Sequence, residues 1–242
     1  MYKVLLINGS PRKSKSCTMR IANKFVEGIK RKCDCTVETV TLADCNIKQC
    51  TGCLSCWGRT AGECVIRDDD IHIIKEKIME ADIIIEAVPL FFFGMPGTVK
   101  VFTDRMLSIM NTYNGQLPVV GKPFHGFRYD MSGKIFVVVS TCGYAQTDLI
   151  YDPMLAQYDC ICGKGNYYPL LCPQGKLLSV PELWDRMEKF IEKYAEAGSE
   201  LIETGKISDE TIAHLSEAPF DEHRFKLLLN LFWHNEESIT NV

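Results

Sequence analysis

Apolar and polar positions along most of this chain follow a strand–helix rhythm. Five short apolar segments predict strands, at 4–7, 36–42, 81–88, 134–140 and 167–171. Elsewhere apolar residues recur every three or four positions, which predicts helices over 20–30, 71–79, 98–110 and 181–204. Buried strands separated by helices are typical of a parallel sheet covered on both faces. We therefore expect an α/β fold with a doubly wound, five-stranded parallel sheet in the order 2-1-3-4-5, which binds ligands at the carboxyl ends of its strands.

The last part of the chain follows a different pattern. The segment 205–242 contains a helical stretch at 225–233 and no strand-like alternation. This stretch is too apolar for a free tail, because it includes Leu227, Leu228, Leu229 and Trp233. We expect residues 1–204 to form the ligand-binding domain and residues 205–242 to form a helical extension. Packing of this extension on the body is slightly favoured over packing on a partner subunit.

The composition fits one globular domain. Of the 242 residues, 46% are hydrophobic and 24% are charged, which is enough for a full core. The formal net charge of -4 gives no reason to expect nucleic acid or an anionic membrane as a partner. No apolar run has the length of a membrane span, and the chain enters a strand pattern at once, without a signal peptide. A cytoplasmic location is therefore expected.

A serine-rich loop separates the first predicted strand from the first predicted helix. It runs from Asn8 to Thr18. In such a loop backbone N–H groups, hydroxyls and the helix N-terminus can converge on a phosphate. Neither a Gly-Lys-Ser/Thr nor a G-x-G-x-x-G motif is present, so the loop is typical of neither a Walker nor a dinucleotide site. The remaining common ligand is a terminal phosphomonoester such as that of FMN, and an ordinary strand–helix turn is the alternative.

Two further loops follow the third and fourth predicted strands and should lie at the same edge of the sheet. The loop 88–97 contains three consecutive aromatic residues, Phe91 to Phe93, which cannot all face a core. At least one must be exposed or cover a flat group such as an isoalloxazine ring, although a hydrophobic turn or a subunit contact would also explain them. The loop 140–144 offers backbone N–H groups, the Thr141 hydroxyl and the Tyr144 ring.

Three segments together resemble the NAD(P)H-dependent FMN reductase family of flavodoxin-like proteins. They are Gly-Ser-Pro-Arg-Lys at 9–13, Pro-Leu-Phe-Phe-Phe-Gly-Met-Pro-Gly at 89–97 and Lys-Val-Phe-Thr-Asp-Arg at 100–105. The resemblance covers about residues 1–200. It implies a flavodoxin-like fold, bound FMN, NAD(P)H as substrate, transfer to a second acceptor, and a homodimer or homotetramer with flavins near subunit interfaces. Many members have a tyrosine soon after the first proline of the second segment, where this chain has Leu90 and Phe91, so the substrate preference stays open.

The resemblance also assigns cofactor-binding residues by position. The first loop would hold the phosphate with Ser10, Arg12, Ser16, Cys17 and Thr18. The second loop would line the ring with Pro89, Leu90, Phe91, Phe92, Phe93 and Gly94. The third would contact the far side of the ring with Thr141, Cys142, Gly143 and Tyr144. No catalytic residues are expected, because the cofactor supplies the redox chemistry and the protein supplies orientation and electrostatics.

Five of the twelve cysteines crowd one short segment: Cys45, Cys50, Cys53, Cys56 and Cys64. The last four are spaced as thiolate ligands of a [4Fe–4S] cluster can be, and the segment resembles the motif of iron–sulfur flavoproteins. Reduced structural thiols and a redox disulfide remain open. Zinc fits less well, because its ligands usually come as two separated pairs. Cys45 would be a spare thiol.

Three functions are compatible with these features. The first is an FMN-dependent NAD(P)H oxidoreductase that passes electrons by a ping-pong mechanism to a small-molecule acceptor such as a quinone or flavin. The second is an iron–sulfur flavoprotein that exchanges electrons with ferredoxin-like partners, and the third is a thiol redox sensor. Asp104 and Arg105 are expected to form a structural ion pair. The loop 121–134 is expected to be a surface insertion, with a lid over the flavin as the less favoured alternative.

Overall fold

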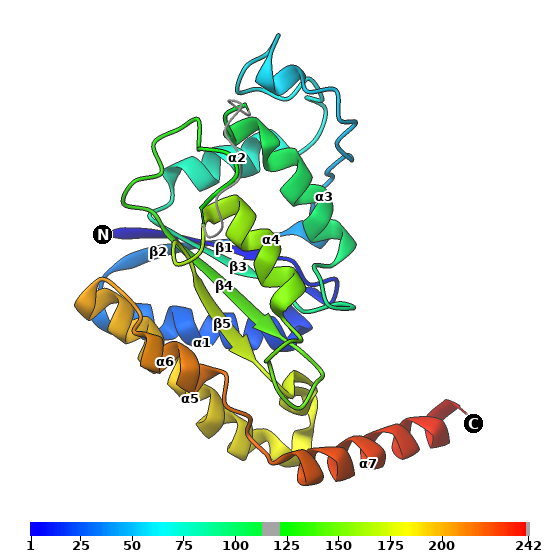
Figure 1. The fold of residues 1–242 in the computed structure, drawn as a ribbon. Coiled ribbons are helices and arrows are strands. Elements are labelled where there is room, and N and C mark those ends of the chain that lie inside the picture. Colours follow the sequence, from blue (N-terminus) through cyan, green and yellow to red (C-terminus); the bar gives the residue numbers. More distant parts are fainter. Residues whose placement is uncertain (113–121, 241–242) are drawn as a thin grey trace.

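The protein is described from a computed structural model, which covers residues 1–112 and 122–240 (Figure 1). Five parallel strands form one sheet in the order β2-β1-β3-β4-β5. Val4 of β1 lies between Val37 of β2 and Ile83 of β3, and Ile83 also pairs with Ile135 of β4. The strands are β1 (Tyr2–Asn8), β2 (Cys35–Thr41), β3 (Ile83–Ala87), β4 (Ile135–Thr141) and β5 (Tyr168–Cys172). The predicted flavodoxin-like α/β fold is confirmed.

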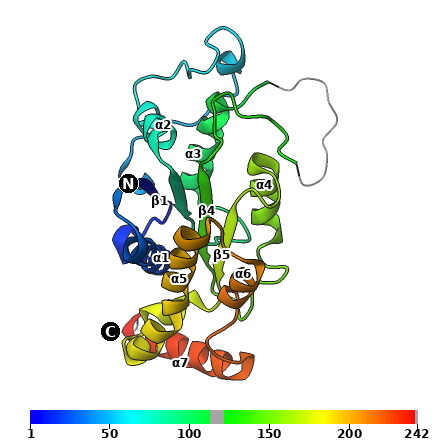
Figure 2. The same cartoon turned by 90° about the vertical axis from the view of Figure 1, so that its left-hand side faces the viewer.

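Seven helices are present in the described part of the chain: α1 (Cys17–Lys32), α2 (Ile71–Glu80), α3 (Gly97–Arg105), α4 (Asp152–Cys162), α5 (Trp184–Thr204), α6 (Asp209–Leu215) and α7 (Glu222–Thr240). Helices α1 and α5 cover one face of the sheet, and α2, α3 and α4 cover the other (Figures 1 and 2). The backbones of α1 and α5 touch at two glycines. A Cβ at Gly28 would lie 1.8 Å from the Ala195 carbonyl oxygen, and one at Gly198 would lie 2.1 Å from that of Phe25. No larger residue fits at either position.

The structure differs from the sequence prediction in two helical regions. Helix α4 was not predicted, although Met154, Tyr158 and Cys162 recur every four residues and are buried. The single helix expected over 98–110 is an α-helix that ends at Arg105, followed by a 3-10 turn at Met106–Ile109. Similarly, the helix expected over 181–204 begins with the 3-10 turn Pro181–Leu183.

The first part of the C-terminal extension packs on the body. Ile207, Leu215 and Phe225 belong to the core on the α1 and α5 side of the sheet. The Tyr194 hydroxyl on α5 donates to the Leu215 carbonyl oxygen at 2.9 Å. Helix α7 then projects away from the body as an arm (Figure 1), and Leu227 on it is half-exposed. Asn241 and Val242 lie outside the described residues, and the division into two domains stays a prediction. No helix in the described ranges is both long and apolar enough to cross a membrane.

One carboxylate, Glu86, lies on the central strand β3 among apolar side chains. Its Oε2 accepts a hydrogen bond from the Tyr158 hydroxyl at 2.7 Å. Glu86, Tyr158, Cys162 and Tyr167 line a cavity of about 60 Å³ between the sheet and the helices that cover it. Desolvation raises the pKa of Glu86, and the hydrogen bond from Tyr158 offsets this effect in part. The folded protein therefore binds the Glu86 proton more tightly than the unfolded chain does.

We expect Glu86→Gln to stabilise the protein at pH 8 and to have little effect at pH 4. The pKa of Glu86 is raised on folding, so the proton on Glu86 favours the folded state. This contribution to the free energy of unfolding is complete below about pH 4.3, the pKa of a glutamate in the unfolded chain. It is lost as pH rises from there through the folded pKa, at up to about 1.4 kcal/mol per pH unit. Glutamine keeps an acceptor for Tyr158 and does not ionise. Thermal unfolding at both pH values measures the difference.

The exposed Glu38 on β2, which pairs with Lys77, provides the matched control. Glu38→Gln should change the melting temperature little at pH 4 and at pH 8. If the melting temperatures of Glu86→Gln and the wild type differed equally at both pH values, the raised pKa of Glu86 would not be the cause.

Candidate functional site

The three predicted ligand loops are bonded to one another at the carboxyl edge of the sheet. The Gly9 N–H in the first loop donates to the Ala87 carbonyl oxygen at 2.9 Å, at the start of the second loop. The Leu90 N–H in the second loop donates to the Thr141 carbonyl oxygen at 3.0 Å. The hydroxyls of Thr18 and Thr141 share a buried hydrogen bond of 2.7 Å, which joins the first loop to the third. The edge is therefore one connected surface.

Two serines of the first loop shape it and keep their hydroxyl protons available. The Ser10 Oγ accepts from the Arg12 N–H at 3.2 Å, and the Ser16 Oγ accepts from the Thr18 N–H at 3.2 Å, which caps α1. A hydroxyl that accepts in this way can still donate its own proton to an anion. Both serines therefore fit a phosphate at the positive end of α1. Thr18 is buried and links two loops, so its assigned contact with phosphate stays a prediction.

Positive charge gathers at the N-terminus of α1. Burial raises the pKa of Cys17, whereas the charges of Arg12, Lys176 and Arg20 act in the opposite direction. The Cys17 thiol is therefore neutral near pH 7, and three cations lie within electrostatic reach of it. A cavity of about 500 Å³ beside this loop is lined by Ser14, Ser16 and Arg20, among others. Glu27 and Glu188 also line this cavity, and Glu188 pairs with Arg20, so the charges at its far side are balanced. The positive charge that remains for an anionic group lies at the loop itself, at Arg12 and the N-terminus of α1.

The second loop is a tight turn made of aromatic residues. The Phe91 N–H donates to the Gly94 carbonyl oxygen at 2.9 Å, and the Gly94 N–H donates back at 3.0 Å. The two residues between them, Phe92 and Phe93, have φ angles of 47° and 66°, a left-handed conformation that bulky side chains rarely adopt. Phe92 is 95% exposed, and Phe93 stacks on Tyr144 of the third loop with ring centroids 5.6 Å apart.

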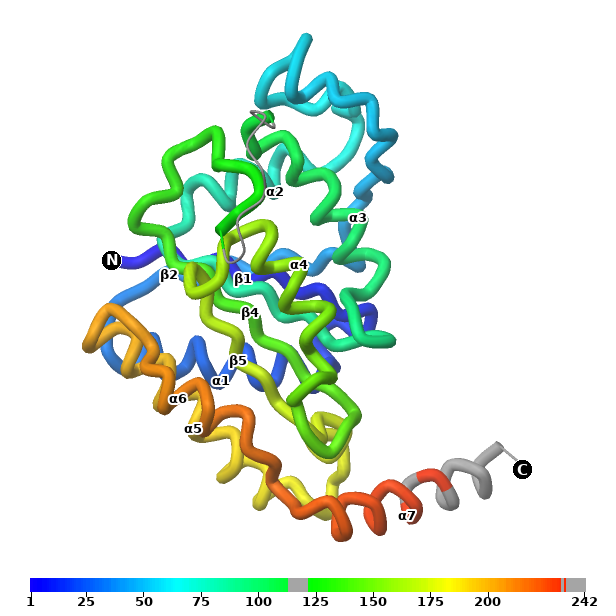
Figure 3. Tube along the Cα trace, viewed as in Figure 1, coloured from blue at the N-terminus to red at the C-terminus, as the bar shows by residue number. Residues whose placement is uncertain are grey.

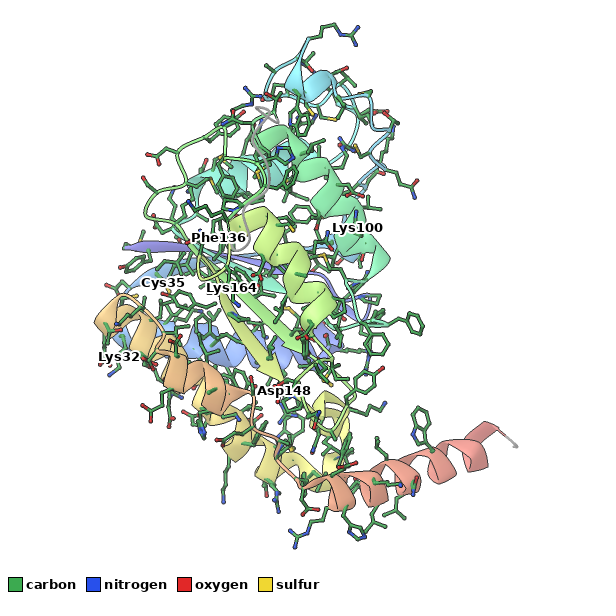
Figure 4. All side chains as sticks on the ribbon, in the orientation of Figure 1. Lys32, Cys35, Lys100, Phe136, Asp148 and Lys164 are labelled. Atoms are coloured by element: carbon green, nitrogen blue, oxygen red, sulfur yellow. The ribbon has the colours of Figure 1, made fainter. Side chains whose placement is uncertain are left out.

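The other assigned residues of the second and third loops divide by exposure. Pro89 is buried, Leu90 is half-buried, and Gly143 is exposed. Cys142 is buried, its N–H donates to the Cys172 carbonyl oxygen at 3.1 Å, and burial raises the pKa of its thiol. The side chains of the third loop that face outward therefore begin after Cys142. Asp148, labelled in Figure 4, lies further along the segment that leads to α4.

A residue that the sequence interpretation missed holds the third loop in place. Gln174 follows β5, is fully buried, and has a left-handed φ of 56°. Its N–H donates to the Tyr144 carbonyl oxygen at 2.9 Å, and its Nε2 donates to those of Ala145 at 3.3 Å and Phe220 at 2.7 Å. It thus ties the third loop to the C-terminal extension. The turn pattern Pro-Gln-Gly at 173–175 was the available signal.

The cysteine loop, defined here as residues 46–70, leaves the carboxyl end of β2 and projects beyond α2 and α3 (Figures 1 and 3). All twelve cysteines are free, and Cys50 and Cys53 are exposed. Burial raises the pKa of Cys56, with added contributions from the charges of Cys64, Cys50 and Cys53. The four thiols are thus electrostatically coupled. Within residues 1–112 and 122–240, however, no three His, Cys, Asp or Glu side chains are close enough together to hold a metal ion.

A groove of about 550 Å³ separates the cysteine loop from the first turns of α3. Cys50 and Gln49 line one side, and Gly97, Thr98 and Lys100 line the other. Lys100, labelled in Figure 4, lies on α3 and pairs with Asp104 one turn later. Because Gly97 ends the second ligand loop, the groove runs from that loop to the first of the four cysteines.

The expected ion pair of Asp104 with Arg105 is wrong. Asp104 binds Lys100, and Arg105 binds Asp69, which lies 36 residues earlier on the cysteine loop. Neither side chain of the Arg105–Asp69 pair is exposed to solvent. Adjacent residues on a helix point in different directions, so Arg105 faces the loop whereas Asp104 faces solvent.

The segment after residue 121 packs on the cysteine loop. The Tyr129 hydroxyl donates to the Gly62 carbonyl oxygen at 3.3 Å, and the His125 ring contacts Trp57 with centroids 4.9 Å apart. The Trp57 Nε1 donates to the Leu107 carbonyl oxygen at 3.2 Å. These contacts fit the favoured surface insertion, and they place this segment against the cysteine loop. Gly121, the first residue of that predicted loop, lies outside the described residues.

Sequence relatives point in two directions. An iron–sulfur flavoprotein of Archaeoglobus fulgidus is 38% identical over 103 residues, which cover 43% of this chain and 48% of that protein. An FMN-dependent NADH:quinone oxidoreductase of Exiguobacterium sp. is 31% identical over 130 residues, 49% of this chain and 62% of that protein. The chain spans about half the length of the curated relatives it matches.

Solved structures share the fold at low sequence identity. An NAD(P)H:quinone oxidoreductase from Methanothermobacter marburgensis is 19% identical, with a TM-score of 0.60 over 83% of this chain and 96% of that one. An FMN-dependent NADH-azoreductase from Bacillus anthracis, solved in complex with FMN, is 18% identical, with a TM-score of 0.53 over 81% of this chain and 98% of that one. The model of the NADPH-dependent FMN reductase family matches residues 2–152, more than half of the chain. The chain therefore belongs to the NADPH-dependent FMN reductase family.

Proposed function

We propose that the protein is an FMN-dependent NAD(P)H oxidoreductase that passes electrons by a ping-pong mechanism to a small acceptor such as a quinone or flavin. The observation that carries the proposal is the connected edge formed by the three loops. This edge combines hydroxyl donors at the positive end of α1 with an exposed aromatic turn. Family membership and the names of the quinone oxidoreductase relatives support the same class of reaction.

In this proposal each loop has a separate task. Ser10 and Ser16 donate to the phosphate, and Arg12 adds charge, so the first loop fixes one end of the cofactor. The 91–94 turn and Tyr144 shield the ring from water at the other end. FMN, when bound, supplies the two-electron chemistry. The same open face would receive NAD(P)H and then the acceptor, so the nicotinamide must leave before the acceptor enters.

Reduction of the flavin in the absence of oxygen tests this proposal directly. Purified protein reconstituted with FMN should lose its yellow absorbance on addition of NADPH or NADH, and a quinone added afterwards should restore it. Stopped-flow absorbance measures both half-reactions. Double-reciprocal plots at several acceptor concentrations should be parallel, because the two substrates use the site in turn. Absence of bleaching by either nucleotide would contradict the proposal.

The second candidate is an iron–sulfur flavoprotein with a [4Fe–4S] cluster on Cys50, Cys53, Cys56 and Cys64 that exchanges electrons with ferredoxin-like partners. Four free thiols on one loop and relatives named iron–sulfur flavoproteins favour it. The residue types fit the cluster, whereas the thiols would have to draw together to ligate it. Assembly as a homodimer or homotetramer and a cytoplasmic location stay predictions.

Iron and acid-labile sulfide, assayed on protein purified without oxygen, separate the two candidates. The iron–sulfur flavoprotein should contain about four irons per chain and a broad visible absorbance beside the flavin bands. Replacement of Cys53 by Ser should then remove most of the iron, whereas the same change at the distant Cys33 should not. A flavin spectrum with no iron would leave the reductase alone.

The aromatic turn offers a separate test of how the ring is held. Two consecutive left-handed phenylalanines each cost of the order of 1 kcal/mol or more, and asparagine adopts this conformation more easily. We expect Phe92→Asn to raise the free energy of unfolding of the FMN-free protein by about 1 kcal/mol. The same change should weaken FMN binding about tenfold, the equivalent of about 1.4 kcal/mol, through loss of an aromatic contact.

Urea unfolding and FMN fluorescence titration measure the two effects. Ile73 is also exposed, but it lies within a regular helix, α2, where the backbone is not strained. Ile73→Asn should therefore not stabilise the protein or change FMN affinity. Phe92→Asn with unchanged FMN affinity would place Phe92 outside the cofactor contacts.

A further inference from the structure

The cysteine loop has little regular structure of its own, yet its two ends are fastened together. The Asp70 N–H donates to the Asn46 carbonyl oxygen at 2.9 Å, and the Asn46 N–H donates to Asp70 Oδ2 at 2.6 Å. Two residues further into the loop, the Lys48 N–H donates to Asp69 Oδ2 at 3.0 Å. These bonds form a closed neck, from which the segment that carries the four cysteines extends.

One side chain from outside the loop completes this neck. The Arg105 guanidinium donates to the Lys48 carbonyl oxygen at 2.8 Å on the entering side and to the Ile66 carbonyl oxygen at 3.1 Å on the returning side. It also binds both carboxylate oxygens of Asp69. A planar fork with five N–H donors can join these four acceptor atoms, whereas the compact ammonium of lysine has only three donors.

Arg105 holds the neck through its two terminal nitrogens. Its Nε is buried and has no hydrogen-bond partner among the described residues. On the returning side the guanidinium binds Ile66, which lies two residues after Cys64 in the sequence. The neck therefore limits the path of the chain directly after the last of the four cysteines.

We propose that Arg105 is the positioning residue of the cysteine loop: its guanidinium closes the neck and so limits where the four thiols can lie relative to α3. Helix α3 begins at Gly97, directly after the aromatic turn, and ends at Arg105. Its two ends lie about 12 Å apart at 1.5 Å per residue. A single rigid helix thus sets the separation between the ligand edge and the thiols. The proposal depends on the proposed function only in taking the edge formed by the three ligand loops as the place where electrons are transferred.

Binding of Cd²⁺ tests the arrangement of the thiols without relying on activity. The charge-transfer absorbance of Cd²⁺–thiolate bonds reports how many thiolates bind together, and a variant with serine at positions 50, 53, 56 and 64 supplies the background from the other eight cysteines. The main variant is Arg105→Gln combined with Asp69→Asn, because the double change leaves no unpaired buried charge. In the described part of the chain the thiols are too far apart to hold a metal ion, so Cd²⁺ binding must draw them together. A closed neck lowers the entropic cost of that step, because it keeps the two ends of the loop in place. We therefore expect the double variant to bind Cd²⁺ 10- to 100-fold more weakly, the range typical for loss of a group that supports metal ligands.

Two further variants distinguish positioning from general stability. Arg105→Lys keeps the charge but loses the fork, so its Cd²⁺ affinity should lie between those of the wild type and the double variant. Lys77→Gln removes a surface pair between α2 and β2 and should bind Cd²⁺ as the wild type does. Hydrogen exchange of residues 46–70 should rise at least tenfold in the double variant, whereas exchange in the five strands and FMN content should stay unchanged.

Two outcomes for the double variant would overturn the proposal. The first is Cd²⁺ affinity and hydrogen exchange of the loop within twofold of the wild type. The second is increased exchange in the strands together with loss of FMN, which would show a general role in folding. The flavin-reduction experiment tests the function of the three ligand loops, and the Cd²⁺ experiment tests the arrangement of the cysteine loop. The failure of one proposal is therefore distinguishable from the failure of the other.

Discussion

Backbone hydrogen bonds at the ends of the strands hold together the three ligand loops, which form the ligand edge of the sheet. The Gly9 N–H bonds to the carbonyl group of Ala87, and the Leu90 N–H bonds to that of Thr141. The position of Gly9 is itself constrained, because a Cβ there would lie 2.3 Å from Val99 and 3.3 Å from the Ala87 carbonyl oxygen. Since the main chain makes these links, the three loops keep their relation to one another while their side chains are free to differ. The register of the parallel sheet thus determines where a ligand can bind.

That rigid edge also explains how a strained aromatic turn can persist. Phe92 and Phe93 adopt a conformation that costs free energy locally, and Phe92 gains little from burial because it is almost fully exposed. The hydrogen bonds between Phe91 and Gly94, and the bond from Leu90 to the third loop, determine the backbone path around the turn. The strain is therefore maintained by the sheet.

The sequence was informative where burial repeats along the chain. The strands and their order could be predicted because runs such as Ile83 to Ile85 are buried on both faces, and the loops followed from the strand ends. Helix α4 was missed because Tyr158 and Cys162 give a weak apolar signal, although their spacing from Met154 is regular. Gln174 and the partner of Arg105 were missed for another reason. Their contacts join residues far apart in the sequence, and local patterns carry no information about such pairs.

The Arg105–Asp69 pair shows how a long irregular segment can be ordered without regular secondary structure. A buried ion pair is costly unless hydrogen bonds satisfy the remaining groups, and here the Asp69 carboxylate also accepts from the N–H groups of Lys48 and Ile71. Such a pair adds little net stability compared with an apolar contact, but it tolerates few alternative geometries. The loop gains a defined position from it while the four thiols stay free of disulfide bonds. The same helix then connects this position to the ligand edge, because α3 begins directly after the aromatic turn and ends at Arg105.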